Sequence, residues 1–148
     1  MSDVDSAKLV HAVLLLDAPL VAETTNVVGD EVVSDIYGPP GLPTDWSIRK
    51  GLFFLGGGGP GDEQIPIARE TFDFYCYGDD AKEARAVFIK LRRCLHRRAH
   101  TRITIDSEVY ILQYSQLLSG PQDRTDPTEG WNVVYCSFMI QFVETTVP

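Results

Sequence analysis

Apolar and polar positions alternate most clearly in two segments, one near the middle of the chain and one near its end. In residues 71–77, Phe72, Phe74 and Cys76 point to one side of an extended chain, and the residues between them point to the other. In residues 131–143, the same spacing gives an uninterrupted apolar set: Val134, Cys136, Phe138, Ile140 and Phe142. Both segments are therefore predicted to be strands that turn one side toward a core.

Two helices are predicted from apolar residues that recur every three or four positions. The clearer helix follows Gly78 and has a single apolar stripe, which consists of Ala84, Val87, Phe88, Leu91 and Leu95. Asp80 and Glu83 have the spacing of a capping box at its start. Residues 6–16 form the other predicted helix, which Pro19 either ends or follows with a second short turn.

Further strands are predicted at residues 30–38, 52–55, 101–106 and 108–118, and a polar loop is predicted at residues 119–130. The order of elements is therefore helix, strands, helix, strands. Strands joined by short turns favour a mostly antiparallel sheet with both helices packed on one face. The chain is predicted to be a single α+β domain that spans residues 1–148.

The final strand is apolar on both sides, which a sheet with one solvent-facing side does not need. The set opposite the core consists of Trp131, Val133, Tyr135, Ser137, Met139, Gln141 and Val143. Little chain remains to cover this second face with a further layer, so self-association is the preferred explanation. Val133, Tyr135 and Met139 are the candidate subunit-interface residues of this strand.

Composition and charge indicate an ordinary globular protein that avoids polyanions. The chain has 148 residues, of which 44% are hydrophobic and 23% charged, values that suit one domain. Its formal net charge of −8 opposes binding to nucleic acid and to anionic membranes. The first residues lack the pattern of a signal peptide, and no apolar stretch is long enough to span a bilayer. We expect a protein that is made and kept in a cytoplasm-like compartment.

A basic cluster nevertheless closes the central helix, and it consists of Arg92, Arg93, Arg97 and Arg98. It complements the negative end of the helix dipole. It can also bind phosphates, or an acidic patch on another copy or on a partner. No aromatic residue lies between Arg92 and Arg102, so the stacking residues of single-strand binders are missing there. Protein–protein contact is the favoured role, with Arg92, Arg93 and Arg97 as candidate interface residues.

The sequence contains no motif for catalysis, and no cofactor is expected. Four consecutive glycines before Pro60 are followed by Asp62 and Glu63, not by the Lys and Ser or Thr of a phosphate-binding loop. His96 and His100 have a spacing that can hold a metal, and Asp106 is the nearest third ligand. The flanking arginines oppose a cation, so solvated polar residues are the favoured interpretation.

The three cysteines show no metal-binding or redox spacing. Cys76, Cys94 and Cys136 are far apart in the sequence, and each lies in an apolar segment. We expect all three thiols to be buried, reduced and free of metal, acting as small hydrophobic side chains.

Two long stretches of the chain resemble the tail terminator, or tail-completion, proteins of long-tailed bacteriophages. They are IARETFDFYCYGDDAKEARAVFIKLRRCL and GWNVVYCSFMIQFVE, and LVHAVLLLDAPLVA is a supporting match. The resemblance implies a virion protein that forms a ring, usually of six subunits, on the finished tail tube. Such a ring stops tube growth and forms the surface that joins tail to head.

The same resemblance implies the partners of the protein. They are other copies of the chain, the tail tube protein, and the head-completion or stopper protein of the neck. Genomic DNA slides through the ring channel without tight binding, which suits an acidic chain. The family has no enzymatic residues to carry over, so no catalytic or metal-binding role is assigned to any residue.

Two segments rich in Gly, Pro and acidic residues, 39–66 and 120–130, are predicted to be mobile in the free protein and to contact neighbours in the assembly. The candidate contact residues within them are Gly57, Gly58, Asp62, Asp123 and Asp126. Two alternative functions stay open. One is a head-completion or stopper protein of the same neck, and the other is a cytoplasmic dimer that holds a small ligand between its sheets.

Overall fold

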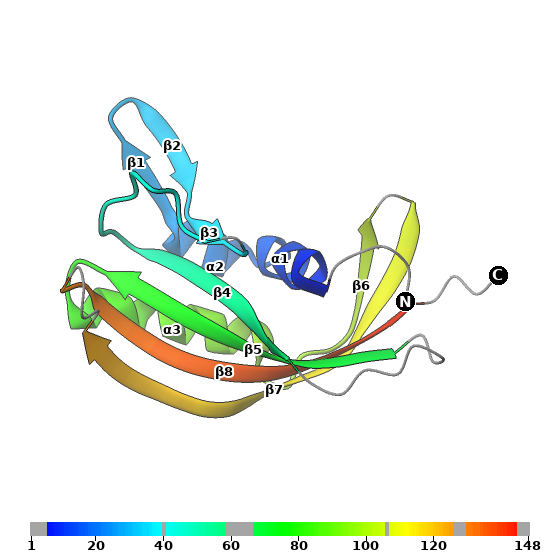
Figure 1. The fold of residues 1–148 in the computed structure, drawn as a ribbon. Coiled ribbons are helices and arrows are strands. Elements are labelled where there is room, and N and C mark those ends of the chain that lie inside the picture. Colours follow the sequence, from blue (N-terminus) through cyan, green and yellow to red (C-terminus); the bar gives the residue numbers. More distant parts are fainter. Residues whose placement is uncertain (1–5, 40, 59–66, 106, 126–129, 145–148) are drawn as a thin grey trace.

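The structure, a computed structural model, describes residues 6–39, 41–58, 67–105, 107–125 and 130–144 (Figure 1). The helices in this part of the chain are α1 (Ser6–Leu16), α2 (Ala18–Glu23) and α3 (Ala81–Leu95). The strands of the main sheet are β3 (Ile36–Tyr37), β4 (Gly51–Gly58), β5 (Ile67–Gly78), β6 (Ala99–Ile105), β7 (Glu108–Thr125) and β8 (Asn132–Glu144). A separate hairpin consists of β1 (Thr25–Val28) and β2 (Glu31–Ser34).

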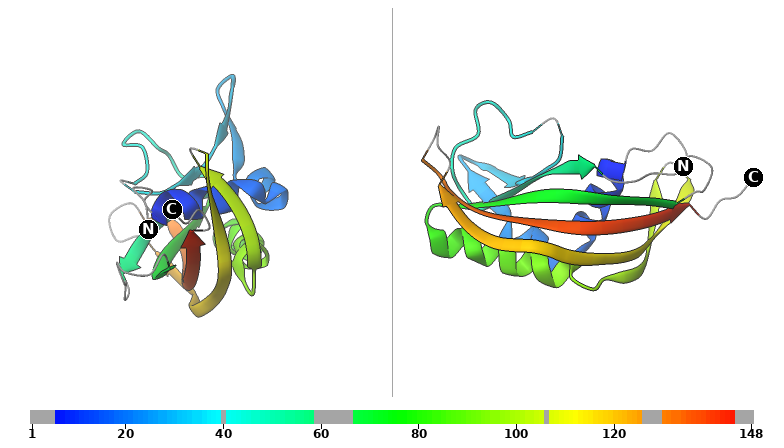
Figure 2. Two further views of the ribbon diagram at one scale, coloured as in Figure 1. Left: turned by 90° about the vertical axis from the view of Figure 1, so that its right-hand side faces the viewer. Right: turned by 60° about the horizontal axis from the view of Figure 1, so that its bottom comes forward.

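The main sheet has six strands in the order β3-β4-β5-β8-β7-β6. The β3–β4 pair is parallel, and the other neighbouring strands run antiparallel. The sheet is curled along its length, as two further views show (Figure 2). These findings confirm the prediction of an α+β domain with a mostly antiparallel sheet.

The main hydrophobic core forms where the helices pack on one face of the sheet. The predicted core sides of β5 and β8 are both buried, with Phe74 and Phe138 in edge contact at 5.4 Å between ring centroids. The predicted stripe of α3 is buried against them in full. From the N-terminal part, α1 and α2 contribute these side chains: Leu9, Val10, Val13, Leu14 and Leu20. The short turn expected after Pro19 is the helix α2, whose N-cap is Asp17.

The start of α3 follows the expected capping pattern with one difference. Asp80 accepts a hydrogen bond from the Glu83 amide at 2.8 Å, as in a capping box. The Glu83 carboxylate accepts from the amide of Asp79 at 2.9 Å, one residue before the position that the motif predicts. Gly78 makes the turn possible because a β-carbon there would lie 2.4 Å from the Ala84 nitrogen.

The N-terminal strand region differs from the prediction of one strand over residues 30–38. This segment is divided between β2 and β3, and Asp35 between them is fully buried. The strand β1 was not predicted at all. It pairs with β2 through a tight turn in which Gly29 has a φ of 63°.

The predicted polar loop at residues 119–130 is also wrong over its first half. Strand β7 continues to Thr125, and residues 122–125 pair with β8 from Tyr135 to Asn132. Two register shifts between Leu117 and Gln122 accommodate Gly120 and Pro121, so pairing resumes beyond them. Pro121 therefore interrupts the ladder without ending the strand.

Part of the second face of the sheet is covered by the chain itself, although little of the chain was expected to remain for this. Residues 41–50 pass over one end of β4, β5 and β8. The buried members of the resulting cluster are Trp46, Tyr77 and Val133, packed against Tyr37, Leu42, Ile48, Phe53, Tyr75 and Trp131. Trp46 lies in edge contact with Tyr77 and with Trp131. A tryptophan in a segment rich in Pro and Gly thus supplies a small second core.

Candidate assembly surfaces

Next to the Trp46 cluster, the second face carries a row of partly exposed aromatic rings that crosses three strands. Phe53, Tyr75 and Tyr135 are register partners on β4, β5 and β8. Their ring centroids are 5.9 Å apart for the first pair and 5.4 Å for the second. The Arg124 guanidinium from β7 lies over the Tyr135 ring at 4.2 Å, a cation–π contact. The row presents flat, partly exposed rings of the type enriched in protein interfaces.

The Tyr135 hydroxyl is tied to the same face by a carboxylate. It donates a hydrogen bond of 2.7 Å to Asp73 on β5. This hydrogen bond, together with burial, raises the pKa of Tyr135 above its usual value. A shallow pocket of about 260 Å³ opens beside the row. Its lining residues are Phe53, Leu55, Tyr75, Tyr77, Arg124, Thr125 and Val133.

The three interface candidates on β8 do not have the same environment. Val133 is only 6% exposed, because the cluster around Trp46 covers it within its own subunit. Tyr135 and Met139 are half-buried and lie on the uncovered side. Val133 is therefore unavailable to a neighbour in this conformation, and the interface hypothesis narrows to Tyr135 and Met139.

The candidate contact residues of the two predicted loops do not all lie in loops. Gly57 and Gly58 belong to the end of β4, where Gly58 pairs with Thr71. Asp62 and Asp126 lie outside the described residues.

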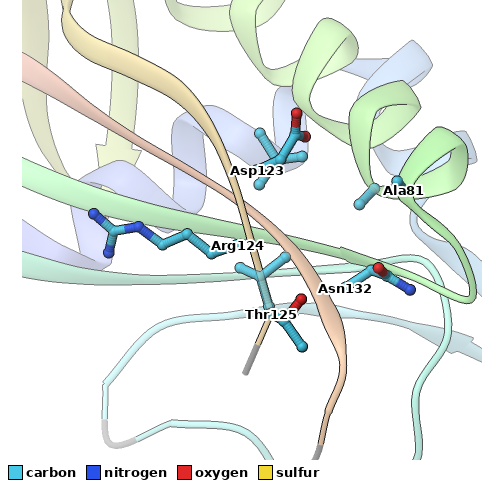
Figure 3. Close-up of a pocket in the computed structure, with 8 residues that line it drawn as sticks. Ala81, Asp123, Arg124, Thr125 and Asn132 are labelled. Carbon is cyan, nitrogen blue, oxygen red and sulfur yellow. The ribbon is translucent and has the colours of Figure 1, made fainter. Parts of the chain in front are cut away.

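Asp123 lies in strand β7, not in a loop, and it has a partner within the subunit. Its carboxylate forms an ion pair of 2.6 Å with Arg85 of α3. Figure 3 shows Asp123 on the α3 side of β7 and Arg124 on the opposite side, around a pocket of about 130 Å³ near Ala81 and Asn132. Both side chains of the ion pair are about half exposed, so it contributes little to stability.

The arginine cluster divides into one structural residue and three exposed ones. Arg98 donates to the Cys94 carbonyl at 3.2 Å and so caps the end of α3. Arg92, Arg93 and Arg97 are exposed, and their side chains make no ion pair with any described residue. These three arginines stay candidates for contact with a partner.

The histidine pair does not have the geometry that its sequence spacing suggested. Helix α3 ends at Leu95, and His96 is its C-cap, with the ring Nδ1 accepting from the Leu117 amide at 3.3 Å. His100 lies in β6. The two rings are therefore not one helical turn apart. Among the described residues, no group of three His, Cys, Asp or Glu side chains is arranged to hold a metal.

A buried carboxylate organises the base of the hairpin and the segment over the second face. Asp35 accepts hydrogen bonds from Asn26 of β1 at 2.7 Å and from the Tyr37 hydroxyl at 2.7 Å. It also accepts from the Trp46 indole at 3.2 Å and from Arg49 Nη2 at 3.0 Å. These five residues are called the Asp35 cluster below.

The Asp35 cluster is arranged for a charged carboxylate. Burial alone raises the pKa of Asp35, but its hydrogen bonds from Arg49, Tyr37, Asn26 and Trp46 outweigh this, so its pKa is lowered. Burial and the bond to Asp35 raise the pKa of Tyr37 to about 12. The Arg49 guanidinium also lies over the Trp46 ring at 5.1 Å. The cluster therefore fixes three segments to one another.

The three cysteines are free and buried, as the sequence predicted. Burial raises the pKa of Cys94 to about 12 and raises that of Cys76 well above its usual value. Such thiols stay protonated at neutral pH and react slowly. No described helix has the length and apolar character that crossing a membrane requires.

One solved structure has a chain with this arrangement of elements. It is titled "Virion of native gene transfer agent (GTA) particle", and its chain matches with a TM-score of 0.56 and 19% sequence identity. The match covers 91% of both chains. No protein-family model and no curated protein matches the sequence. At this level of identity the likeness establishes a common fold.

Sequence reasoning missed two features of the fold, the Asp35 cluster and the β1–β2 hairpin. The hairpin had a signal in the sequence, because Gly29-Asp30-Glu31 lies between two pairs of valines and Gly-Asp is typical of a two-residue hairpin turn. The Asp35 cluster had none, since its members are separated by up to 23 residues and come together only in the fold.

Proposed function

We propose that this chain is a structural protein of a phage-type virion and that it acts there as a tail terminator. Copies of the chain form a ring, of six subunits, on the end of the finished tail tube. The ring stops tube growth and presents its other side to the head-completion or stopper protein. The observation that carries the proposal is the fold shared with a virion chain over 91% of both chains.

Two further observations agree with this role. The net charge of −8 keeps the protein from gripping DNA that must slide through the ring. The partly exposed Tyr135 and Met139 and the exposed arginines of α3 supply surfaces for neighbouring subunits. The role requires positioning of partners and no catalytic step.

Electron microscopy of the purified protein, alone and with polymerising tail tube protein, tests the proposal. We expect rings whose channel is wide enough for duplex DNA, and tubes that stop growing once a ring occupies their end. Met139→Asp should abolish both effects, while the exposed control Thr104→Asp on β6 should keep them.

Other outcomes would contradict the tail terminator role. Rings that bind the head connector but leave tube growth unchanged would indicate a stopper protein. Compact dimers that never assemble with tail tube protein would indicate a ligand-binding module instead.

A further inference from the structure

The β1–β2 hairpin projects from the body of the protein (Figures 1 and 2). Three of its valine side chains are exposed to solvent. Val27 and Val32 are register partners, so their side chains lie together on one face of the hairpin. Each of these valines is 72% exposed, and Val28 on the other face is 43% exposed. A two-stranded hairpin is marginal in water by itself, and this one leaves a valine pair uncovered.

The hairpin lies in the acidic part of the chain. Asp30 and Glu31 form its exposed tip. Between Lys8 and Arg49 there is no lysine or arginine, while six acidic residues occur in that interval. The projecting arm therefore combines an apolar face with a negative tip.

The solvent face of α3 has the complementary character. Ile89 is 45% exposed, and Arg85, Arg92 and Arg93 are its neighbours at the helical spacings i−4, i+3 and i+4. Residues 82–98 contain seven of the thirteen basic side chains and a single acidic one, Glu83. An exposed isoleucine thus has Arg92 and Arg93 beside it, which form no ion pair with a described residue, whereas Arg85 pairs with Asp123.

The fold keeps these two surfaces apart within one subunit. Thr25 donates to the Val21 carbonyl of α2, and Asn26 donates to Asp35 and to the Lys50 carbonyl. These bonds fix the base of the hairpin, whose tip points away from α3 in the views of Figures 1 and 2.

We propose that the hairpin of one copy lies on the exposed face of α3 of the next copy. Val27 and Val32 cover Ile89, and Asp30 and Glu31 face Arg92 and Arg93. Because the two surfaces differ, the contact is head-to-tail, and repeating it with a closing rotation produces a ring. This contact rests on the proposed ring function and adds a second contact between neighbouring subunits to the one proposed for Tyr135 and Met139.

Cross-linking tests the contact directly, since the native cysteines are all buried. A chain that carries both Val32→Cys and Ile89→Cys should give a ladder of covalent oligomers with a short bis-maleimide. Either substitution alone should give no ladder. The matched control, Ile89→Cys with Thr104→Cys, places the second thiol on exposed β6 and should give none. A ladder from the control but not from the test pair would overturn the proposal.

Mixing two assembly-defective variants tests the head-to-tail geometry. Val27→Asp with Val32→Asp removes the hairpin surface, and Arg92→Glu with Arg93→Glu removes the helix surface. Each protein alone should be monomeric by sedimentation, with a ring affinity weakened by about tenfold or more. A mixture should stop at a one-to-one heterodimer, because a single intact hairpin and a single intact helix remain to pair. Unchanged circular dichroism melting would show that both variants fold.

Exchanging the charges of the two surfaces tests whether ring formation can be restored. Asp30→Lys and Glu31→Lys, combined in one chain with Arg92→Glu and Arg93→Glu, should restore rings that either reversed pair abolishes. If wild-type protein forms rings and both reversed variants keep them, the interface lies elsewhere while the proposed function stands. Variants that keep their rings but no longer bind tail tube protein would make the hairpin a contact to that partner, which also overturns the proposal. If wild-type protein forms no ring even on tail tubes, the proposed function itself is refuted.

Discussion

Removing the Asp35 carboxylate should destabilise the protein strongly. Asp35→Ala deletes the common acceptor of four side chains, of which the Trp46 indole is buried. A buried donor left without a partner destabilises by about 1–3 kcal/mol. The side chain of Arg49 is 18% exposed, so its guanidinium regains some water when the carboxylate is lost. The expected loss is therefore that of a broken buried ion pair, about 3–5 kcal/mol in the free energy of unfolding.

Equilibrium unfolding in urea, followed by far-ultraviolet circular dichroism, measures this loss. Asp45→Ala is the matched control, because Asp45 is an exposed acid one residue before Trp46. The control should change the free energy of unfolding by no more than about 0.5 kcal/mol. Tryptophan fluorescence should also shift to longer wavelength in native Asp35→Ala protein, as Trp46 becomes hydrated. A loss below about 1 kcal/mol would refute the idea that the cluster holds these segments together.

Four further predictions follow from the same structure. Phe138→Asp should unfold the chain, because an unpaired buried carboxylate costs several kcal/mol against a typical stability of roughly 5–15 kcal/mol. Met139→Asp should stay folded and fail to assemble. Loss of the circular dichroism signal in both variants would refute the interface. Because the pKa of Asp35 is lowered in the folded state, its carboxylate stabilises the fold at pH values above the usual pKa of 3.8. The difference in the free energy of unfolding between wild type and Asp35→Asn should therefore be constant near neutral pH and shrink as the pH falls through the folded-state pKa. Gly78→Ala should lower the free energy of unfolding by about 1–3 kcal/mol, measured in urea, since the added carbon meets backbone. Cys94, with a pKa of about 12, should react with Ellman's reagent only as fast as the protein opens, and a rapid native-state reaction would contradict its burial.

The elements with strong periodicity were predictable from sequence. Helix α3 and the strands β5 and β8 carry long apolar sets at a single period, and the structure buries those sets as expected. Local capping at Asp80 was also visible, because its partners lie within three residues. These features depend on neighbours in sequence, which is the information that a pattern contains.

The features that were missed depend on contacts distant in sequence. Trp46 lies in a short segment with Pro, Gly and polar residues, in which Leu42 and Ile48 show no helix or strand period, and the aromatic side of β5 and β8 makes its burial favourable. In the sequence, Asp35 was one polar position in a predicted strand. The side chains that donate hydrogen bonds to it, such as Trp46 and Arg49, lie outside that strand, so the pattern did not indicate its burial. The paired segment after Pro121 was obscured because proline and glycine normally end a strand, and register shifts allow this one to continue.

For the three interface candidates on β8, the alternation of residues predicted which face of the sheet they occupy. It did not predict which part of that face the chain itself covers. Alternation placed Val133 with Tyr135 and Met139 on the side away from the helices, where all three lie. It could not separate Val133, which the segment of residues 41–50 covers, from Tyr135 and Met139. Whether Tyr135 and Met139 meet another subunit stays a prediction.

The position of β8 has a consequence for the order in which the protein can be made. This strand follows all the others in the chain, yet it lies between β5 and β7 in the middle of the sheet. On the ribosome, the sheet therefore exists as two unconnected parts, β3-β4-β5 and β7-β6, until β8 has been synthesised and has left the exit tunnel. Pairing between strands that are distant in sequence is slow, because the entropy of closing the intervening chain is lost before the stabilising contacts form. The six-stranded sheet, and with it the aromatic row of Phe53, Tyr75 and Tyr135 on its second face, is therefore complete only once β8 has been added.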